Sequence, residues 1–142
     1  MDEETGARVR ASFARQSLME TFGASVDALA PGSCTISAPI GANARQQHGV
    51  GHAGLTFALG DTAAGYAALT LMPEGAEVMT VEMKINLMAP AAGARLIATG
   101  RVVKAGRRLT VVTAEVEAET EAGTRRTVAL MQGTMIAVDP VG

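Results

Sequence analysis

The sequence has no tryptophan, one tyrosine and three phenylalanines, although 48% of its 142 residues are hydrophobic. A core without aromatic bulk has to be built from Ala, Val, Leu, Ile and the eight methionines. Such small side chains favour closely packed elements and leave apolar surface that a second subunit can cover. The length suits one domain, residues 1–142, that folds without disulfides or a structural metal.

An excess of charge of one sign is also lacking, since 12 basic residues face 14 acidic ones. Without a positive field there is nothing to attract nucleic acid or an anionic membrane, so neither is expected as a partner. Cys34 is the only cysteine, which excludes an intrachain disulfide and the zinc-ligand spacings. The N-terminus, MDEETGARVR, lacks the basic start and apolar core of a secretory signal. We therefore expect a cytoplasmic protein.

The run from Gly49 to Pro73 is uncharged except for Asp61 and is long enough to span a bilayer. It contains Asp61 near its centre and is rich in Gly, Ala and Thr, which argues against a membrane helix. We predict a buried helix from Ala53 to Met72 instead, ended by Pro73 and Gly75.

The other elements follow from the spacing of apolar residues. Helical spacing predicts an amphipathic helix from Gly6 to Phe22. The predicted strands are Val26–Ala30, Cys34–Ala38, Val78–Met88, Ala94–Lys104, Leu109–Thr120 and Thr127–Val138. Short connections predict that the last four form an antiparallel meander. The fold class is therefore α+β, with one antiparallel sheet wrapped around the central helix.

Asp61 lies eight residues inside the central helix, too far from its start to act as a cap. An unpaired carboxylate in a core is costly, so Asp61 is expected to face a cleft or an interface. A structural Asp, hydrogen-bonded to backbone or water, is the alternative. The start of the same helix, around Ala53, offers backbone N–H groups without intrahelical partners, which can hold an oxyanion.

A carboxylate and an oxyanion-binding helix end are together the parts of an acyl hydrolase. Ala53 and Asp61 are, however, about 12 Å apart along one helix. They can serve the same carbonyl only if Asp61 comes from a second subunit whose helix runs antiparallel. We therefore expect at least a homodimer, with a homotetramer as a pair of dimers. Small helix residues such as Gly60 and Ala64 suit either contact between subunits or tight packing within one chain.

Three other site types are disfavoured. His48 and His52 share a face only on a helix, and Gly49 and Gly51 interrupt them, so no metal site is expected. No serine stands in a nucleophile-elbow motif, and the GxGxxG letters at residues 49–54 lack a βαβ unit. We expect no cofactor, with His52 orienting the helix start and His48 near a pocket mouth.

Three basic residues, Lys104, Arg107 and Arg108, cluster around the predicted turn Ala105–Arg108. Such a cluster can bind the phosphates of a nucleotide-bearing substrate. A solvated hairpin tip is the alternative, and the sequence favours it.

From Phe13 to Val138 the chain resembles the hotdog-fold acyl-CoA thioesterases of the PaaI-like type. The most specific part is a polar residue, here Gln46, six positions before the segment His52-Ala53-Gly54 at a helix start. A short apolar stretch from Phe57 to Asp61 follows it. The later segment Val78 to Ala91 resembles the strand that follows the central helix in that family.

The resemblance implies hydrolysis of an acyl-CoA to a free acid and CoA. A pocket lined by Leu, Met and Phe would accept an aromatic or a medium-chain acyl group, and the sequence does not rank the two. It implies that Asp61 is the nucleophile or general base and that the Ala53 N–H polarises the thioester carbonyl. Gln46 would hold water or the acyl group, and Thr80 would assist Asp61 by a hydrogen bond. The site would lie between two subunits. The candidate substrate-binding residues are His52, Gly54, His48, Lys104, Arg107 and Arg108.

The sequence departs from the family pattern in that Ala53 replaces a Gly and Gln46 stands where Asn is common. Alternation along Val78–Met88 also puts Thr80 on the face opposite the apolar set, which comprises Met79, Val81, Met83, Ile85 and Leu87. Two other functions stay open: a non-catalytic acyl-CoA-binding module, and a hotdog hydratase. The hydratase would want His and Asp closer together.

Overall fold

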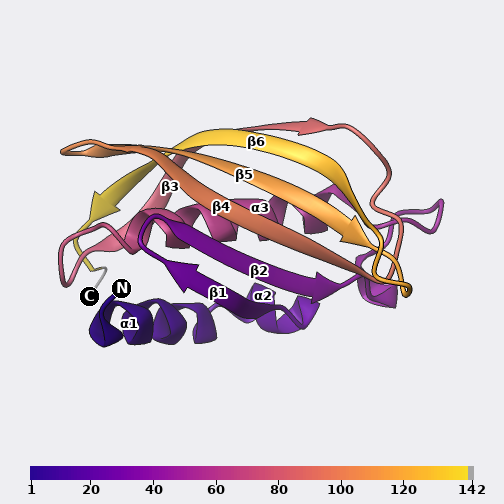
Figure 1. Ribbon diagram of the computed structural model, residues 1–142, viewed down its shortest axis with the longest axis horizontal. Helices are drawn as coiled ribbons and strands as arrows, with labels where there is room; N and C mark the ends of the chain where they lie inside the picture. Colours follow the sequence, from indigo (N-terminus) through magenta and orange to yellow (C-terminus); the bar gives the residue numbers. More distant parts are fainter. Residues whose placement is uncertain (141–142) are drawn as a thin grey trace.

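The computed structural model describes residues 1–140, so residues 141 and 142 of the predicted domain 1–142 lie outside the described residues. A six-stranded antiparallel sheet curves around one central helix, and two short N-terminal helices lie beside its first strands (Figure 1). This is the α+β arrangement that the sequence predicted. In chain order the elements are α1 Glu3–Ala14, α2 Ser17–Phe22, β1 Ser25–Ala30, β2 Ser33–Pro39, η1 Ala42–Ala44, α3 Ala53–Leu69, β3 Glu77–Leu87, β4 Arg95–Ala105, β5 Leu109–Glu119 and β6 Arg125–Val138.

The single N-terminal helix predicted from Gly6 to Phe22 is wrong, because it is two helices divided at residues 15 and 16. Val9 and Met19 are ten residues apart, which turns them toward different sides of one straight helix. The break lets both side chains lie in the core, where each is almost fully buried.

Helix α3 is apolar on nearly all sides because it is enclosed by the sheet and the N-terminal helices. It ends at Leu69, before the predicted Met72, where the Thr70 hydroxyl donates to the Ala67 carbonyl at 2.6 Å. The Arg8 guanidinium donates to the carbonyl oxygens of Leu69 and Pro73, each at 2.8 Å. A cation at this C-terminus stabilises the helix dipole and ties α1 to α3.

The strand order is β1-β2-β4-β5-β6-β3, so the predicted four-stranded meander is wrong at its first connection. Strands β4, β5 and β6 are consecutive neighbours, whereas β3 pairs with β6. One side of β4 is already paired with β2 and the other with β5, which leaves only the free edge of β6 to β3. The connection, residues 88–94, crosses the end of the curved sheet near the start of α3, where Gly51 N–H donates to Ala91 O at 2.9 Å.

Strand β3 contains a bulge that changes which side chains face α3. The pairing with β6 shifts between Thr80 and Glu82, so Val81 is an extra residue. Thr80 consequently points toward α3, while Met79 and Val81 are 56% and 55% exposed. The uniform alternation predicted for this strand is therefore wrong at these three positions.

Gly100 of β4 lies directly beneath α3, and a Cβ there would collide with the backbone of Ala63 and Ala64. We expect Gly100→Ala to lower the free energy of unfolding by about 1–3 kcal/mol, because the helix has to move away from the sheet. Urea denaturation measures this loss. Gly65→Ala is the matched control, since its added Cβ would lie 3.8 Å from the nearest atom, Met135 Cε. Equal stability of Gly100→Ala and wild type would contradict the close packing.

Candidate active site

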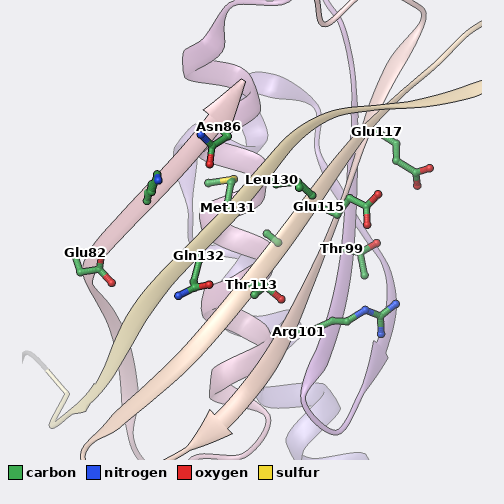
Figure 2. Close-up of a pocket in the computed structure, with 12 residues that line it drawn as sticks. Glu82, Asn86, Thr99, Arg101, Thr113, Glu115, Glu117, Leu130, Met131 and Gln132 are labelled. Atoms are coloured by element: carbon green, nitrogen blue, oxygen red, sulfur yellow. The ribbon is translucent and has the colours of Figure 1, made fainter. Parts of the chain in front are cut away.

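A hollow of about 720 Å³ lies on the face of the sheet opposite α3. Figure 2 shows polar side chains from β3, β4, β5 and β6 spread over this face, with α3 behind the strands. Both charge signs are present, for example Arg101 and Glu115. Neither the start of α3 nor Asp61 lines this hollow, so we do not assign the chemistry to it.

The start of α3 presents one free backbone donor. His52 is the N-cap: its Nδ1 accepts from Gly54 N–H at 2.7 Å, and its carbonyl accepts from Leu55 N–H at 2.9 Å. Within residues 1–140, the Ala53 N–H has no hydrogen-bond acceptor. This donor stands at the positive end of the helix dipole, which is suited to a carbonyl oxygen or an oxyanion. The prediction that His52 orients the helix start is confirmed.

The loop before α3 brings Gln46 to the same place. The Arg45 guanidinium donates to Gly49 O and Ile40 O, each at 2.6 Å, and holds the loop closed. The Gln46 side-chain oxygen accepts from the backbone N–H of His48, so its amide group is left to donate. A cavity of about 430 Å³ is lined by Gln46, Ala53 and the apolar connection after β3.

His48, His52 and Gly54 do not line this cavity. The Gly54 N–H is already engaged by the His52 ring, and His48 is exposed in the loop. Of the predicted residues on this segment, the structure therefore brings together Gln46 and Ala53 only. His52 contributes through the cap.

Asp61 lies at a second, separate cavity of about 170 Å³. Its carboxylate is half-buried and accepts a 2.8 Å hydrogen bond from the Thr80 hydroxyl. Burial raises the pKa of Asp61, and the Thr80 hydrogen bond opposes this by lowering it. The bulge in β3 is what aims Thr80 at Asp61, so the two residues meet as the resemblance implied.

Within one chain the two groups of residues stay apart. Gln46 and Ala53 line one cavity, and Asp61 and Thr80 line the other, with no lining residue in common. The rise of the helix separates Ala53 and Asp61 by about 12 Å.

The basic residues Lys104, Arg107 and Arg108 are exposed at the turn between β4 and β5. Just after this turn, Leu109 is level with Ile136 and Met79 across the sheet. The turn therefore lies at the end of the sheet where β3 begins, near Thr80 and away from the loop before α3 (Figure 1). The three cations therefore lie at the same end of the sheet as Asp61, and not at the end with Ala53.

Sequence patterns missed the polar residues that line the Asp61 cavity beside Asp61 and Thr80, among them the cluster Ser12, Gln16 and Tyr66. Tyr66 is the only tyrosine of the chain and stands five residues after Asp61 in an Ala-rich helix. That isolated aromatic hydroxyl was the available signal. Ser12 and Gln16 carried none, because the N-terminal helices approach α3 only in the tertiary structure.

We expect Thr80→Val to move the acidic limb of the activity profile to higher pH. Thr80 lowers the pKa of Asp61, so loss of the hydroxyl raises that pKa further. The role of base or nucleophile, which the resemblance implies for Asp61, requires the carboxylate form, and this form is then lost at a higher pH as the solution is acidified. The pH dependence of kcat/KM measures the shift, with Thr80→Ser as the control that keeps the hydroxyl. An acidic limb that moves to lower pH contradicts this role for Thr80.

Among the described residues, no helix combines the length and apolarity needed to cross a bilayer. Within the same residues, no group of three or more His, Cys, Asp or Glu side chains is placed to hold a metal ion. The Cys34 thiol is buried, and burial raises its pKa to about 12.

Comparison with known proteins identifies the family. The model of the thioesterase superfamily matches residues 48–124, more than half of the chain. A thioesterase family protein from Silicibacter pomeroyi is 44% identical in sequence, with a TM-score of 0.93 over 96% of this chain and 99% of that one. A conserved protein from Pseudomonas aeruginosa is 31% identical, with a TM-score of 0.78 over 87% of this chain and 94% of its own. No curated protein matches the sequence.

The PaaI protein of Escherichia coli, from its phenylacetic acid degradation operon, is 21% identical. It has a TM-score of 0.83 over 96% of this chain and 95% of its own, which shows a common fold. The antiparallel sheet around one central helix is thus the hotdog fold that the resemblance implied. The chain belongs to the thioesterase superfamily.

Proposed function

We propose that the protein hydrolyses the thioester of an acyl-CoA, with an aromatic or medium-chain acyl group, to the free acid and CoA. One observation carries the proposal: the unpaired Ala53 N–H beside Gln46 at a helix start. On the same helix stands a half-buried Asp61 that Thr80 holds in place. Membership of the thioesterase superfamily agrees with this chemistry.

In the proposed mechanism the thioester oxygen accepts from the Ala53 N–H, and the Gln46 amide donates to the same group or to the attacking water. Asp61 takes a proton from water, whose oxygen attacks the carbonyl carbon. The oxyanion so formed is stabilised at the helix start. The carbon–sulfur bond then breaks, and the proton on Asp61 passes to the departing thiolate. A raised pKa makes the Asp61 carboxylate a better base.

Direct attack of Asp61 on the carbonyl is the other course of the same reaction. It forms a mixed anhydride and releases the CoA thiol, and water then cleaves the anhydride to return the carboxylate. Both courses use the Asp61 carboxylate and the Ala53 N–H.

The proposed site is completed by a second copy of the chain. Strand β3 is an edge strand with an unpaired side, and it exposes Met79 and Val81. Pairing of two β3 edges about a two-fold axis makes the two α3 helices antiparallel. The Asp61 end of one helix then approaches the Ala53 end of the other. Pairing of dimers into a homotetramer stays a prediction, as does the cytoplasmic location.

We further propose that Lys104, Arg107 and Arg108 bind the phosphates of CoA. They lie at the same end of the sheet as Asp61 and are exposed, so they are accessible to phosphates outside the cavity. Arg and Lys side chains suit phosphate oxygens because they donate charge-assisted hydrogen bonds.

The test is release of CoA thiol from a panel of aromatic and medium-chain acyl-CoAs by the purified protein. We expect turnover with at least one of them, and light scattering during gel filtration should give a dimer or larger. Binding of acyl-CoA without thiol release would instead support the non-catalytic module. Loss of the enoyl absorbance of an enoyl-CoA, again without thiol release, would support the hydratase.

A further inference from the structure

The 170 Å³ cavity beside Asp61 is polar at its far side. The Tyr66 hydroxyl accepts from the Gln16 side-chain amide at 2.7 Å and lies 3.1 Å from the Ser12 hydroxyl. Tyr66 itself is only 3% exposed, and its ring packs edge-on against Phe13. The N-terminal helices thus close the cavity by hydrogen bonds to α3.

These three side chains leave one donor unused. Ser12 and Tyr66 together carry two hydroxyl hydrogens, and one of them is shared between the two oxygens. Gln16 fills an acceptor position on Tyr66 and uses neither hydrogen. One hydroxyl hydrogen of the pair therefore remains for a further acceptor in the cavity. An occupant that displaces solvent from the cavity has to supply an acceptor in its place, because a buried donor without a partner is costly.

The charges around the cavity oppose an anionic occupant. Asp61 and Glu77 both line it, and the nearby Arg15 guanidinium faces Glu77 at 3.8 Å. A carboxylate placed here would be repelled by both acids. The favoured acceptor is therefore a neutral oxygen.

The cavity also limits the length of an occupant. Tyr66 follows Asp61 by five residues, or about 7.5 Å along the axis of α3. Gly65 lies between them and lines the cavity, so its missing side chain provides part of the space. Only a compact group fits between a thioester carbonyl at Asp61 and the hydroxyl pair.

We propose that this cavity is the acyl pocket and that it selects compact acyl groups ending in a neutral hydrogen-bond acceptor, such as a keto oxygen. Tyr66, with Ser12, determines the specificity by donating to that oxygen. Gly65 sets the space available. The inference rests on the proposed thioesterase function, and for the acyl group it replaces the aromatic or medium-chain class proposed above with compact groups that carry a neutral acceptor.

The test compares kcat/KM for three acyl-CoAs of similar length. They are 4-oxopentanoyl-CoA, its apolar isostere 4-methylpentanoyl-CoA, and the anionic succinyl-CoA. We expect the oxo substrate to be preferred to its isostere by about five- to tenfold, the value of one net hydrogen bond, and succinyl-CoA to be slowest. A faster succinyl-CoA would overturn the inference.

Two variants assign the preference to residues. The double variant Ser12→Ala, Tyr66→Phe removes both hydroxyls and should bring the ratio between the oxo and methyl substrates close to one. Thr35→Val removes a hydroxyl from the half-buried Thr35–Thr99 pair elsewhere in the sheet and should keep the wild-type ratio. Gly65→Ala should lower kcat/KM for 4-oxopentanoyl-CoA relative to acetyl-CoA without loss of stability. An unchanged substrate ratio in the double variant overturns the inference.

Failure of the inference is separable from failure of the proposed function. If no acyl-CoA releases thiol, hydrolysis is wrong, and calorimetry with the same thioesters still tests the pocket. The wild-type protein should then bind 4-oxopentanoyl-CoA more tightly than its methyl isostere, and the double variant Ser12→Ala, Tyr66→Phe should not. Equal affinities in the wild-type protein overturn the pocket assignment.

Discussion

Asp61→Ala is expected to lose at least about 100-fold in kcat/KM for thiol release while remaining folded. The side chain is the one carboxylate that α3 carries, and Thr80 holds it at a cavity. In the proposed mechanism Asp61 is the group that takes the proton from water or attacks the carbonyl. Stopped-flow or continuous detection of the thiol, with circular dichroism of the same sample, measures both parts of this prediction.

Asp27→Ala is the matched control, because Asp27 is an exposed acid on β1 and lines none of the three hollows described above. It should turn over substrate at the wild-type rate. Asp61→Asn is less clean as a test of catalysis, since the amide keeps the hydrogen bonding and is itself slowly hydrolysed to Asp. Wild-type turnover by Asp61→Ala would exclude Asp61 from the chemistry.

The pH dependence of stability gives a second measurement on the same residue. Burial raises the pKa of Asp61 above its usual 3.8, so the folded protein binds this proton more tightly than the unfolded chain. The resulting stability is present below pH 3.8 and is lost as the pH rises through the raised pKa. Relative to Asp61→Asn, the wild-type Tm should therefore fall across that window. A wild-type Tm that rises relative to the variant would contradict the raised pKa.

Restoration of activity by mixing two inactive variants is the other large expected effect. Ala53→Pro removes the free N–H but suits the first position of a helix, and the His52 ψ of 143° is compatible with a following proline. We expect this variant alone to lose about 10²–10³-fold in kcat, the usual effect of one oxyanion donor. Ala53→Gly keeps the N–H and is the control.

A heterodimer of Ala53→Pro and Asp61→Ala chains has one site with both groups intact and one with neither. Two different affinity tags isolate this species, and it should show about half of the wild-type turnover per dimer. The effect is large because both parent homodimers are nearly inactive. If Ala53 and Asp61 served a carbonyl within one chain, the heterodimer would stay as inactive as its parents, and the shared site would be disproved.

Several features of the site were accessible from local sequence patterns. The His52 cap and the buried helix with Asp61 were predicted where the structure has them, because caps and helical spacing act over a few residues. Gln46 was identified only through the resemblance to the family. The pairing of β3 was predicted wrongly. Short connections indicate antiparallel direction, but they do not exclude that a strand crosses the end of a curved sheet to reach β6.

The contact between Thr80 and Asp61 is a second feature that local sequence patterns could not predict. Strict alternation turned Thr80 away from the helix, and only the extra residue Val81 in the pairing with β6 turns it back. No local pattern of side chains indicates that bulge. It arises where Gly133 of β6 lets the backbone of Glu82 approach closely, a contact between residues far apart in the chain.

The sequence by itself determined the family and one helix that carries both an unpaired N–H at its start and a carboxylate near its middle. These depend on spacing along a single segment, and helix geometry alone keeps the two groups about 12 Å apart. The tertiary structure decided which side chains accompany each group: Gln46 at Ala53, and Thr80 with the Ser12, Gln16 and Tyr66 cluster at Asp61. These associations bring together residues from different elements, so they follow from sheet pairing and helix packing rather than from any local pattern.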